Sequence, residues 1–221
     1  MQDDVLVVLT WAVWRTRGKL RAAASAPGPR PQALSRERIL ASTLFSLAVL
    51  VGRSWVVADL SGIRLFALPP LGPWDIAASA AVFLLHFGLR RIAIALHTAE
   101  ELRRSLLSAW MPRTPREWAL YVPVAIGAGL AEEAAYRGVA WNLLTWYTGN
   151  AWVSAAICIV AFGLAHATQS FKSVAVIAVI AALMHALVAF TGTLVLAMIV
   201  HAVYDLVIAV IIGRRAAAAS S

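Results

Sequence analysis

Six long apolar stretches constrain this chain more than any other feature of its sequence. A helix needs about 20 mostly apolar residues to cross the hydrocarbon core of a bilayer. Stretches of that kind are expected at 39–60, 75–97, 118–141, 151–170, 173–190 and 192–213. Of the 221 residues, 61% are hydrophobic and only 14% are charged, a balance far from that of soluble globular domains. The sequence therefore predicts an all-α polytopic membrane bundle with about six transmembrane helices.

The basic residues predict how this bundle is oriented. They give a formal net charge of +8 and gather before the first stretch, between the second and third, between the fourth and fifth, and after the sixth. Cytoplasmic loops carry the excess of Lys and Arg in membrane proteins, so both termini are expected in the cytoplasm. Membrane topology accounts for the charge, and we expect no nucleic-acid partner. The Ala- and Arg-rich composition favours the inner (plasma) membrane of a prokaryotic cell.

A small set of ionisable residues falls inside the predicted spans. A charge at the centre of a span costs on the order of 2.5 to 3.5 kcal/mol on insertion scales, so such residues are functional candidates by default. The set consists of Glu132, Glu133, Arg137, His166, His185, His201 and Asp205. The lone cysteine, Cys158, allows neither an intramolecular disulfide nor a cysteine zinc site.

Helical spacing assigns these residues different tasks, because side chains four apart share one face of a helix. Glu133 and Arg137 are four apart and are predicted to form an ion pair. Glu132 then lies on a neighbouring face without that partner, which makes it a candidate general base. His201 and Asp205 are also four apart, so the carboxylate can fix the orientation of the imidazole.

Each of these features also has a purely structural interpretation. An ion pair such as Glu133 with Arg137 can clamp two helices, and a single intramembrane histidine is more often a packing residue. His86, His97 and His185 lack a partner at helical spacing and are expected to be packing or interfacial residues. Because the other candidates form one set on the third, fourth and sixth predicted helices, a functional interpretation is favoured for them together.

Three motifs occur in a fixed order. Residues 132–137 match Glu-Glu-x-x-x-Arg, residues 162–166 match Phe-x-x-x-His, and residues 201–205 match His-x-x-x-Asn or its Asp variant. Together, on apolar helices, they resemble the CPBP family, also called the Abi or CAAX-protease family, of intramembrane endopeptidases. The resemblance covers roughly residues 118–212.

The resemblance implies intramembrane proteolysis. The expected substrate is a membrane-associated protein or peptide, cut near its C-terminus or membrane anchor, with the lipid bilayer as surroundings. The implied site has Glu132 and His166 activating water, His201 and Asp205 stabilising the oxyanion, and Glu133, Arg137 and Phe162 in support. By this division, residues 1–38 form a cytoplasmic interfacial helix and basic linker. Residues 39–117 form two non-diagnostic spans with a cytoplasmic loop, 118–213 the CPBP/Abi-like catalytic core, and 214–221 a tail.

Two features of the implied mechanism stay open at the level of sequence. Asp205 stands where many family members have Asn, and an ionised carboxylate cannot donate a hydrogen bond to an oxyanion; it is either protonated or orients His201. No cofactor is favoured, but Glu132, His166, His201 and Asp205 are types of residue that can bind zinc, which would make the protein a metalloprotease.

The predicted spans also contain a geometric conflict. They place Glu132 past the middle of the third span and His166 near the cytoplasmic end of the fourth, although both should reach one water. A kink, a re-entrant segment or misplaced span ends would reconcile them.

Two other functions compete with proteolysis. A non-catalytic membrane protein of the same fold, such as a bacteriocin immunity protein or binding scaffold, would not need Glu132 or His166. A transporter could use the same residues as a proton relay, but the sequence shows no inverted repeat.

Overall fold

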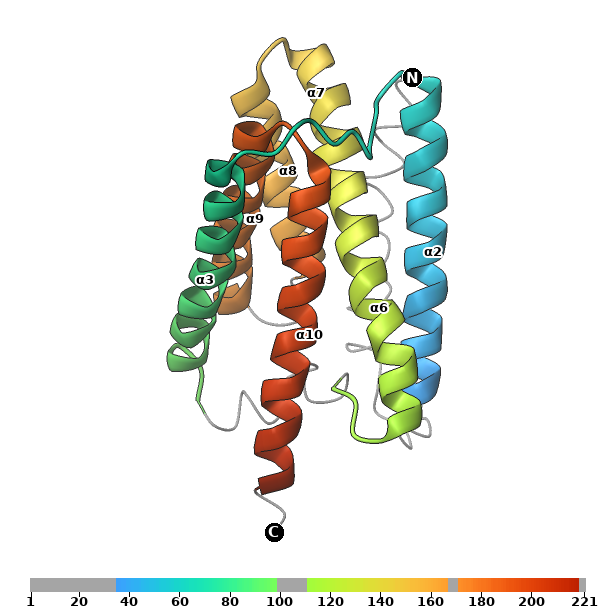
Figure 1. Cartoon of the computed structure of the whole chain (residues 1–221), viewed down its shortest axis with the longest axis vertical. Coiled ribbons are helices and arrows are strands. Elements are labelled where there is room, and N and C mark those ends of the chain that lie inside the picture. Colours follow the sequence, from blue (N-terminus) through green and yellow to red (C-terminus); the bar gives the residue numbers. More distant parts are fainter. Residues whose placement is uncertain (1–34, 99–110, 167–170, 219–221) are drawn as a thin grey trace, which may run out of the picture.

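The computed structural model describes residues 35–98, 111–166 and 171–218 (Figure 1). The predicted interfacial helix and most of the basic linker, residues 1–34, lie outside these ranges. The helices are α2 (Arg36–Leu60), α3 (Pro73–Ala95), α6 (Pro115–Glu133), the π-helix η1 (Ala134–Ala140), α7 (Trp141–Thr148), α8 (Ala151–Ala165), α9 (Phe171–Thr191) and α10 (Leu194–Ala218). No strand occurs in the described ranges, which confirms the all-α prediction.

The bundle is a membrane bundle by the length and composition of its helices. Four of the described helices, α2, α3, α9 and α10, are long and apolar enough to cross a bilayer. The other two predicted spans are helical as well, but α8 has only 15 residues and the third span is longer than expected. α10 continues to Ala218, beyond the predicted boundary at residue 213.

The third predicted span is a continuous run of helix from Pro115 to Thr148, formed by α6, η1 and α7. Its predicted end at residue 141 was wrong; the helix ends at Thr148 and is followed by Gly149, whose φ of 66° is readily adopted by glycine. Asn150 then caps α8 by accepting hydrogen bonds from the backbone of Trp152 (2.9 Å) and Val153 (3.1 Å).

This boundary removes the conflict over depth. Glu132 precedes Gly149 by 17 residues and His166 follows it by the same 17. Because α7 and α8 run in opposite directions and pack together, the two residues lie at a similar depth. The conflict came from the misplaced end of the third span.

The residues around position 114 determine where α6 begins. Thr114 accepts a hydrogen bond from the backbone of Glu117 (3.2 Å), and the Glu117 carboxylate accepts from the backbone of Thr114 (3.1 Å). Pro115 occupies the first helical position, where its missing N–H is not needed. This capping box fixes where α6 begins.

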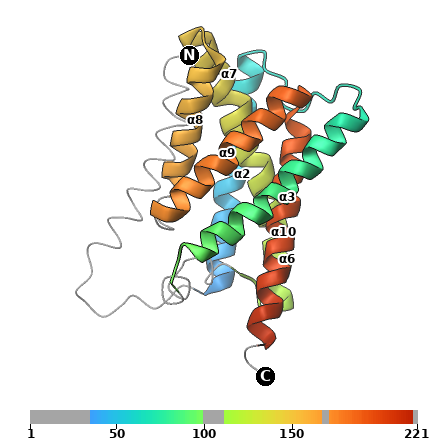
Figure 2. The same cartoon turned by 90° about the vertical axis from the view of Figure 1, so that its left-hand side faces the viewer.

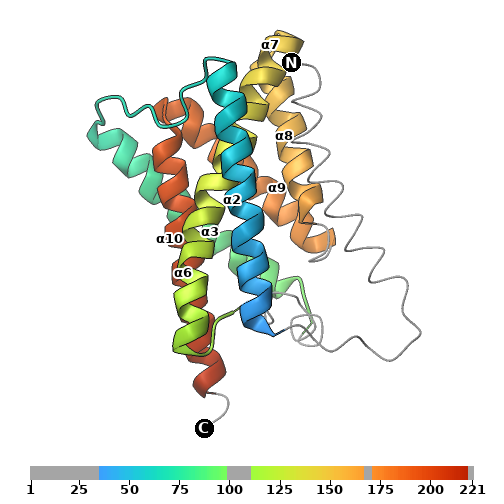
Figure 3. The same ribbon diagram turned by 90° about the vertical axis from the view of Figure 1, so that its right-hand side faces the viewer.

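Helix α6 packs between α2 and α10 (Figures 1 and 3). A Cβ atom added at Gly129 would lie 2.6 Å from the carbonyl oxygen of Met198 and 3.0 Å from the backbone nitrogen of Ala202. The two backbones can approach this closely only because residue 129 has no side chain, as is common where membrane helices meet. This contact brings the end of α6 next to His201.

The remaining helices build the other side of the bundle. α9 packs against α8, α3 and α10, and α3 also contacts α10 (Figure 2). At the end of the molecule where α9 turns into α10, Thr193 donates a hydrogen bond to the carbonyl oxygen of Ala67 (2.7 Å). This bond ties the loop that connects α2 and α3 to the α9–α10 turn.

Candidate active site

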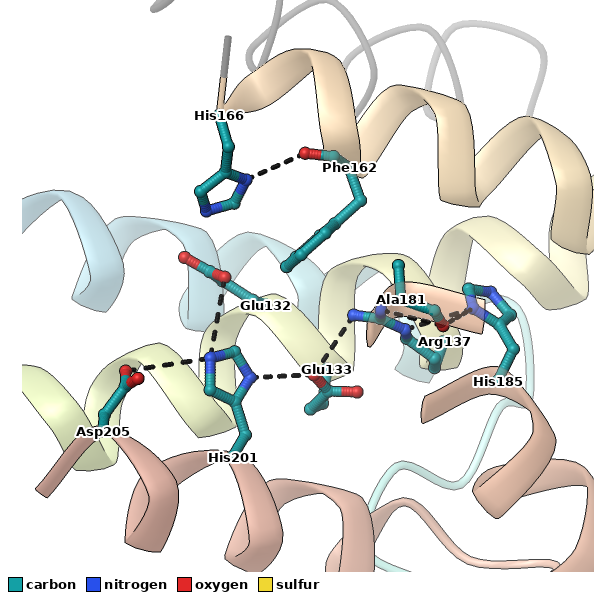
Figure 4. Close-up of polar contacts among 9 residues, drawn as sticks. All are labelled: Glu132, Glu133, Arg137, Phe162, His166, Ala181, His185, His201 and Asp205. Atoms are coloured by element: carbon teal, nitrogen blue, oxygen red, sulfur yellow. Dashed lines mark hydrogen bonds and ion pairs between the residues drawn. The ribbon is translucent and has the colours of Figure 1, made fainter. Parts of the chain in front are cut away.

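The structure brings residues of all three motifs together (Figure 4). Glu132 and Glu133 end α6, Arg137 lies in η1, and His166 follows α8 directly. His201 and Asp205 lie one turn apart on α10. The π-helix η1 is buried along its whole length, and π segments inside α-helices are frequent at functional sites.

Glu133 and Arg137 form the predicted ion pair, which is almost inaccessible to solvent. Arg137 Nη1 donates to Glu133 Oε1 at 3.1 Å, and both side chains are only 1% exposed. The guanidinium carbon of Arg137 also lies 4.5 Å from the centre of the Phe162 ring, a cation–π geometry. Burial makes the pair strongly interdependent, because either charge alone would be uncompensated.

His201 is held by Glu133. Its Nδ1 lies 2.9 Å from Glu133 Oε1, and since that carboxylate is ionised beside Arg137, Nδ1 donates the hydrogen. The other ring nitrogen, Nε2, faces Glu132 Oε2 at 4.0 Å and Asp205 Oδ2 at 3.8 Å. The sequence had paired His201 with Asp205, but the hydrogen bond that fixes the ring comes from another helix.

His166 is oriented by its own helix. Its Nδ1 lies 2.8 Å from the carbonyl oxygen of Phe162, which can only accept, so Nδ1 carries the hydrogen and Nε2 is an acceptor in the neutral ring. The His166 and Phe162 rings pack at 4.7 Å, and Phe162 packs edge-on against Tyr136 at 5.0 Å. Figure 4 shows the His166 ring and the Glu132 carboxylate facing each other.

Exposure divides the site into two groups. We call Glu133, Arg137 and His185 the buried group, since Glu133 and Arg137 are 1% exposed and His185 is 4% exposed. We call Glu132, His166, His201 and Asp205 the accessible group. The side chains of Glu132, His201 and Asp205 are 21%, 17% and 32% exposed, and His166 is partly exposed. Only the accessible group can be reached by water or a substrate.

His185 is the residue whose place in the site the sequence did not indicate. It was expected to be a packing residue, yet its Nδ1 lies 3.3 Å from Arg137 Nε. The two residues are 48 positions apart on different helices, so no spacing rule could connect them. An isolated histidine in an otherwise apolar helix was the only available signal.

The Glu132 carboxylate faces the His166 ring, and His201 Nε2 lies 4.0 Å from Glu132 and 3.8 Å from Asp205 (Figure 4). All four side chains are partly exposed. Within the described residues, no three His, Cys, Asp or Glu side chains are grouped so that they could hold a metal ion. General acid–base chemistry on a polar bond is what such a set can perform.

Comparison with protein families agrees with the motifs. Residues 114–207 match the family model described as type II CAAX prenyl endopeptidase Rce1-like. No curated protein and no solved structure matches the chain. The matched range contains all three motifs, and the family supports an intramembrane endopeptidase embedded in lipid with a membrane protein as substrate. Over residues 114–207, the chain is therefore similar to the Rce1-like type II CAAX prenyl endopeptidases of the CPBP family.

Proposed function

We propose that this protein hydrolyses a peptide bond near the C-terminus or membrane anchor of a membrane-associated protein or peptide, using water activated by Glu132. The observation that carries the proposal is that Glu132, His166 and His201 converge and that all three side chains are partly exposed. The family match makes peptide hydrolysis the reaction class that this geometry supports best.

Glu132 and His166 bind and activate the water. Both Glu132 and the Nε2 atom of neutral His166 accept hydrogen bonds, so one water can donate to both. Glu132 takes a proton as the water oxygen attacks the carbonyl carbon of the substrate. The same carboxyl group then gives that proton to the leaving nitrogen as the C–N bond breaks, which releases an acid and an amine.

His201 stabilises the oxyanion that forms in between. Its Nδ1–H is used by Glu133, so it donates from Nε2 only as an imidazolium. Three carboxylates lie within 4.0 Å of its ring nitrogens and provide the compensating charge. A fixed donor directed at a developing negative charge is usually the largest electrostatic contribution to such reactions.

In this scheme Asp205 acts on His201 and not on the oxyanion. Its carboxylate lies 3.8 Å from His201 Nε2, where it supports the imidazolium without donating a hydrogen bond. This is one of the two roles that the sequence left open.

No step in this scheme uses a metal, and we propose a glutamate-activated water as the catalytic type. The cleavage assay therefore includes a chelator, which distinguishes a zinc-dependent reaction from the proposed metal-free one.

The test is a cleavage assay in liposomes with a library of fluorogenic peptides, with and without a chelator. Glu132→Gln should lower kcat by about 10²- to 10⁴-fold, the usual contribution of a general base. Its melting temperature should not change, because the carboxylate is 21% exposed and lies 4.0 Å from His201. Glu37→Gln, at an exposed glutamate in the first turn of α2, is the matched control and should cleave normally.

Each other outcome has a defined meaning. Normal cleavage by Glu132→Gln overturns the role of Glu132. Loss of activity with the chelator and its recovery with zinc overturns the metal-free mechanism. Absence of cleavage by the wild-type protein across the library, including prenylated peptides, favours the non-catalytic alternative.

A further inference from the structure

His185 is a buried polar residue in an otherwise apolar stretch of α9, only 4% exposed. We propose that His185 is a positioning residue of the site: its Nδ1 accepts a hydrogen bond from Arg137 and, through Arg137 and Glu133, fixes the orientation of His201. The inference rests on the proposed function, because it concerns the geometry of the residues that carry out the reaction.

Arg137 donates in three directions. Nη1 donates to Glu133 at 3.1 Å, Nη2 to the carbonyl oxygen of Ala181 at 3.3 Å, and Nε to His185 Nδ1 at 3.3 Å. The guanidinium is rigid and planar, so three separate acceptors fix both its position and its rotation. Two of those acceptors belong to α9, which is therefore the helix that aligns Arg137.

The proposal assigns the tautomer of His185. Nδ1 also lies 3.0 Å from the carbonyl oxygen of Ala181, but one nitrogen cannot donate there and accept from Arg137. Arg137 Nε can only donate, so its contact with Nδ1 at 3.3 Å is a hydrogen bond when Nδ1 carries no hydrogen. The proposal therefore requires a neutral His185 with its hydrogen on Nε2, and the Trp141 ring packs edge-on against it at 5.2 Å.

This tautomer is not the choice that stability alone would favour. The Nε2 atom of His185 is buried and has no hydrogen-bond partner within the described structure, and an unpartnered buried N–H destabilises a fold. An apolar residue would avoid that loss. A residue that is locally unfavourable beside a reactive site indicates a task other than packing.

The position of Arg137 affects the orientation of His201 through one atom, Glu133 Oε1. Glu133 Oε1 accepts from Arg137 Nη1 at 3.1 Å and from His201 Nδ1 at 2.9 Å. A rotation of Arg137 therefore shifts the oxygen that orients His201, while the contacts that Figure 4 draws for His185 are with Arg137 and Ala181 and not with the accessible group.

Two variants separate positioning from packing. His185→Leu fills the space but removes the acceptor, and should lower kcat by about a hundredfold with little change in KM, as expected for a small misplacement of a reactive group. His185→Asn keeps an oxygen acceptor near the place of Nδ1 and should restore most of kcat. Equal kcat for wild type and His185→Leu at full occupancy overturns the proposal.

His86 provides the matched control. It is 3% exposed on α3, and its Nδ1 lies 2.8 Å from the carbonyl oxygen of Val82 four residues earlier, a backbone contact similar in distance to the 3.0 Å between His185 Nδ1 and the Ala181 oxygen. His86→Leu should keep kcat, with any melting-temperature change similar to that of His185→Leu. A loss of kcat as large as that of His185→Leu would show a general packing effect and overturn the proposal.

A second readout does not depend on activity. The chain has five histidines, so nitrogen-15 NMR of histidine-labelled protein in nanodiscs gives few signals, and His185→Asn assigns the signal of His185. An unprotonated Nδ1 and a protonated Nε2 are expected. A protonated Nδ1 overturns the proposal whatever Glu132→Gln does in the cleavage assay, so failure of this inference and failure of the proposed function are distinguishable.

Discussion

The buried group and the accessible group use the same residue types for opposite purposes. Glu132 and Glu133 are neighbours in the sequence, yet Glu133 is 1% exposed and bonded to both Arg137 and His201, whereas Glu132 is 21% exposed and lies 4.0 Å from His201. Adjacent helical residues point about 100° apart, so the Glu133 carboxylate is buried in the protein whereas the Glu132 carboxylate is partly exposed. Two neighbouring carboxylates of the same chemistry therefore differ in burial and in partners, and these two properties assign one to the structure and leave the other exposed to reactants.

The histidines repeat this contrast. In the proposed tautomer, His185 Nδ1 accepts a hydrogen bond from Arg137. His201 bonds Glu133 through Nδ1, and its Nε2 lies 3.8 Å from the partly exposed carboxylate of Asp205. If the division is correct, breaking the buried ion pair of Glu133 with Arg137 should affect stability as well as the reaction, and changes in the accessible group should affect the reaction alone.

The largest effect on the fold is expected for Arg137→Met. Removing the guanidinium leaves the Glu133 carboxylate buried without a counter-charge, which should lower the free energy of unfolding by about 3–5 kcal/mol. Chemical denaturation in detergent measures this. Arg53→Met, at an exposed position on α2, is the control with little expected change. An Arg137→Met protein as stable as the control would contradict the structural role of the buried group.

A smaller effect is expected where α6 meets α10. Gly129→Ala adds a Cβ atom 2.6 Å from the Met198 carbonyl oxygen, so the helices must separate. Overpacking of this kind should cost about 1–3 kcal/mol of stability, and kcat should fall because Glu132 and Glu133 move away from His201.

Gly127 is the matched control on the same helix. A Cβ atom there would lie 3.6 Å from Leu47 Cδ1, an ordinary contact, so Gly127→Ala should keep both stability and kcat. If both alanine variants behave alike, the close approach of α6 and α10 does not set the geometry of the site.

The smallest effect is expected for Asp205→Asn. Asp205 is 32% exposed and lies 3.8 Å from His201, so its charge should contribute about 0.2–1 kcal/mol. That corresponds to a loss of kcat of up to about fivefold, with an unchanged melting temperature. The measured kcat of Asp205→Asn tests this expectation, since a hundredfold loss would give Asp205 a direct role in the reaction.

The sequence predicted some contacts of the site correctly and others incorrectly. The ion pair of Glu133 with Arg137 was predicted correctly, because an i, i+4 pair depends only on helical geometry. The orienting partner of His201 was expected at Asp205 by the same rule, but Glu133 lies closer. A spacing rule finds partners on one helix and cannot compare them with partners on another.

The helices themselves followed from the sequence, since a continuous apolar run in a bilayer must satisfy its backbone hydrogen bonds internally. The caps at Thr114 and Asn150 are equally local. What the tertiary structure alone decided is the π-helix η1, the contact of Gly129 with α10, and the bond from Arg137 to His185. Each depends on which helices become neighbours, and that is set by packing across the whole bundle, whereas hydropathy and spacing describe one helix at a time.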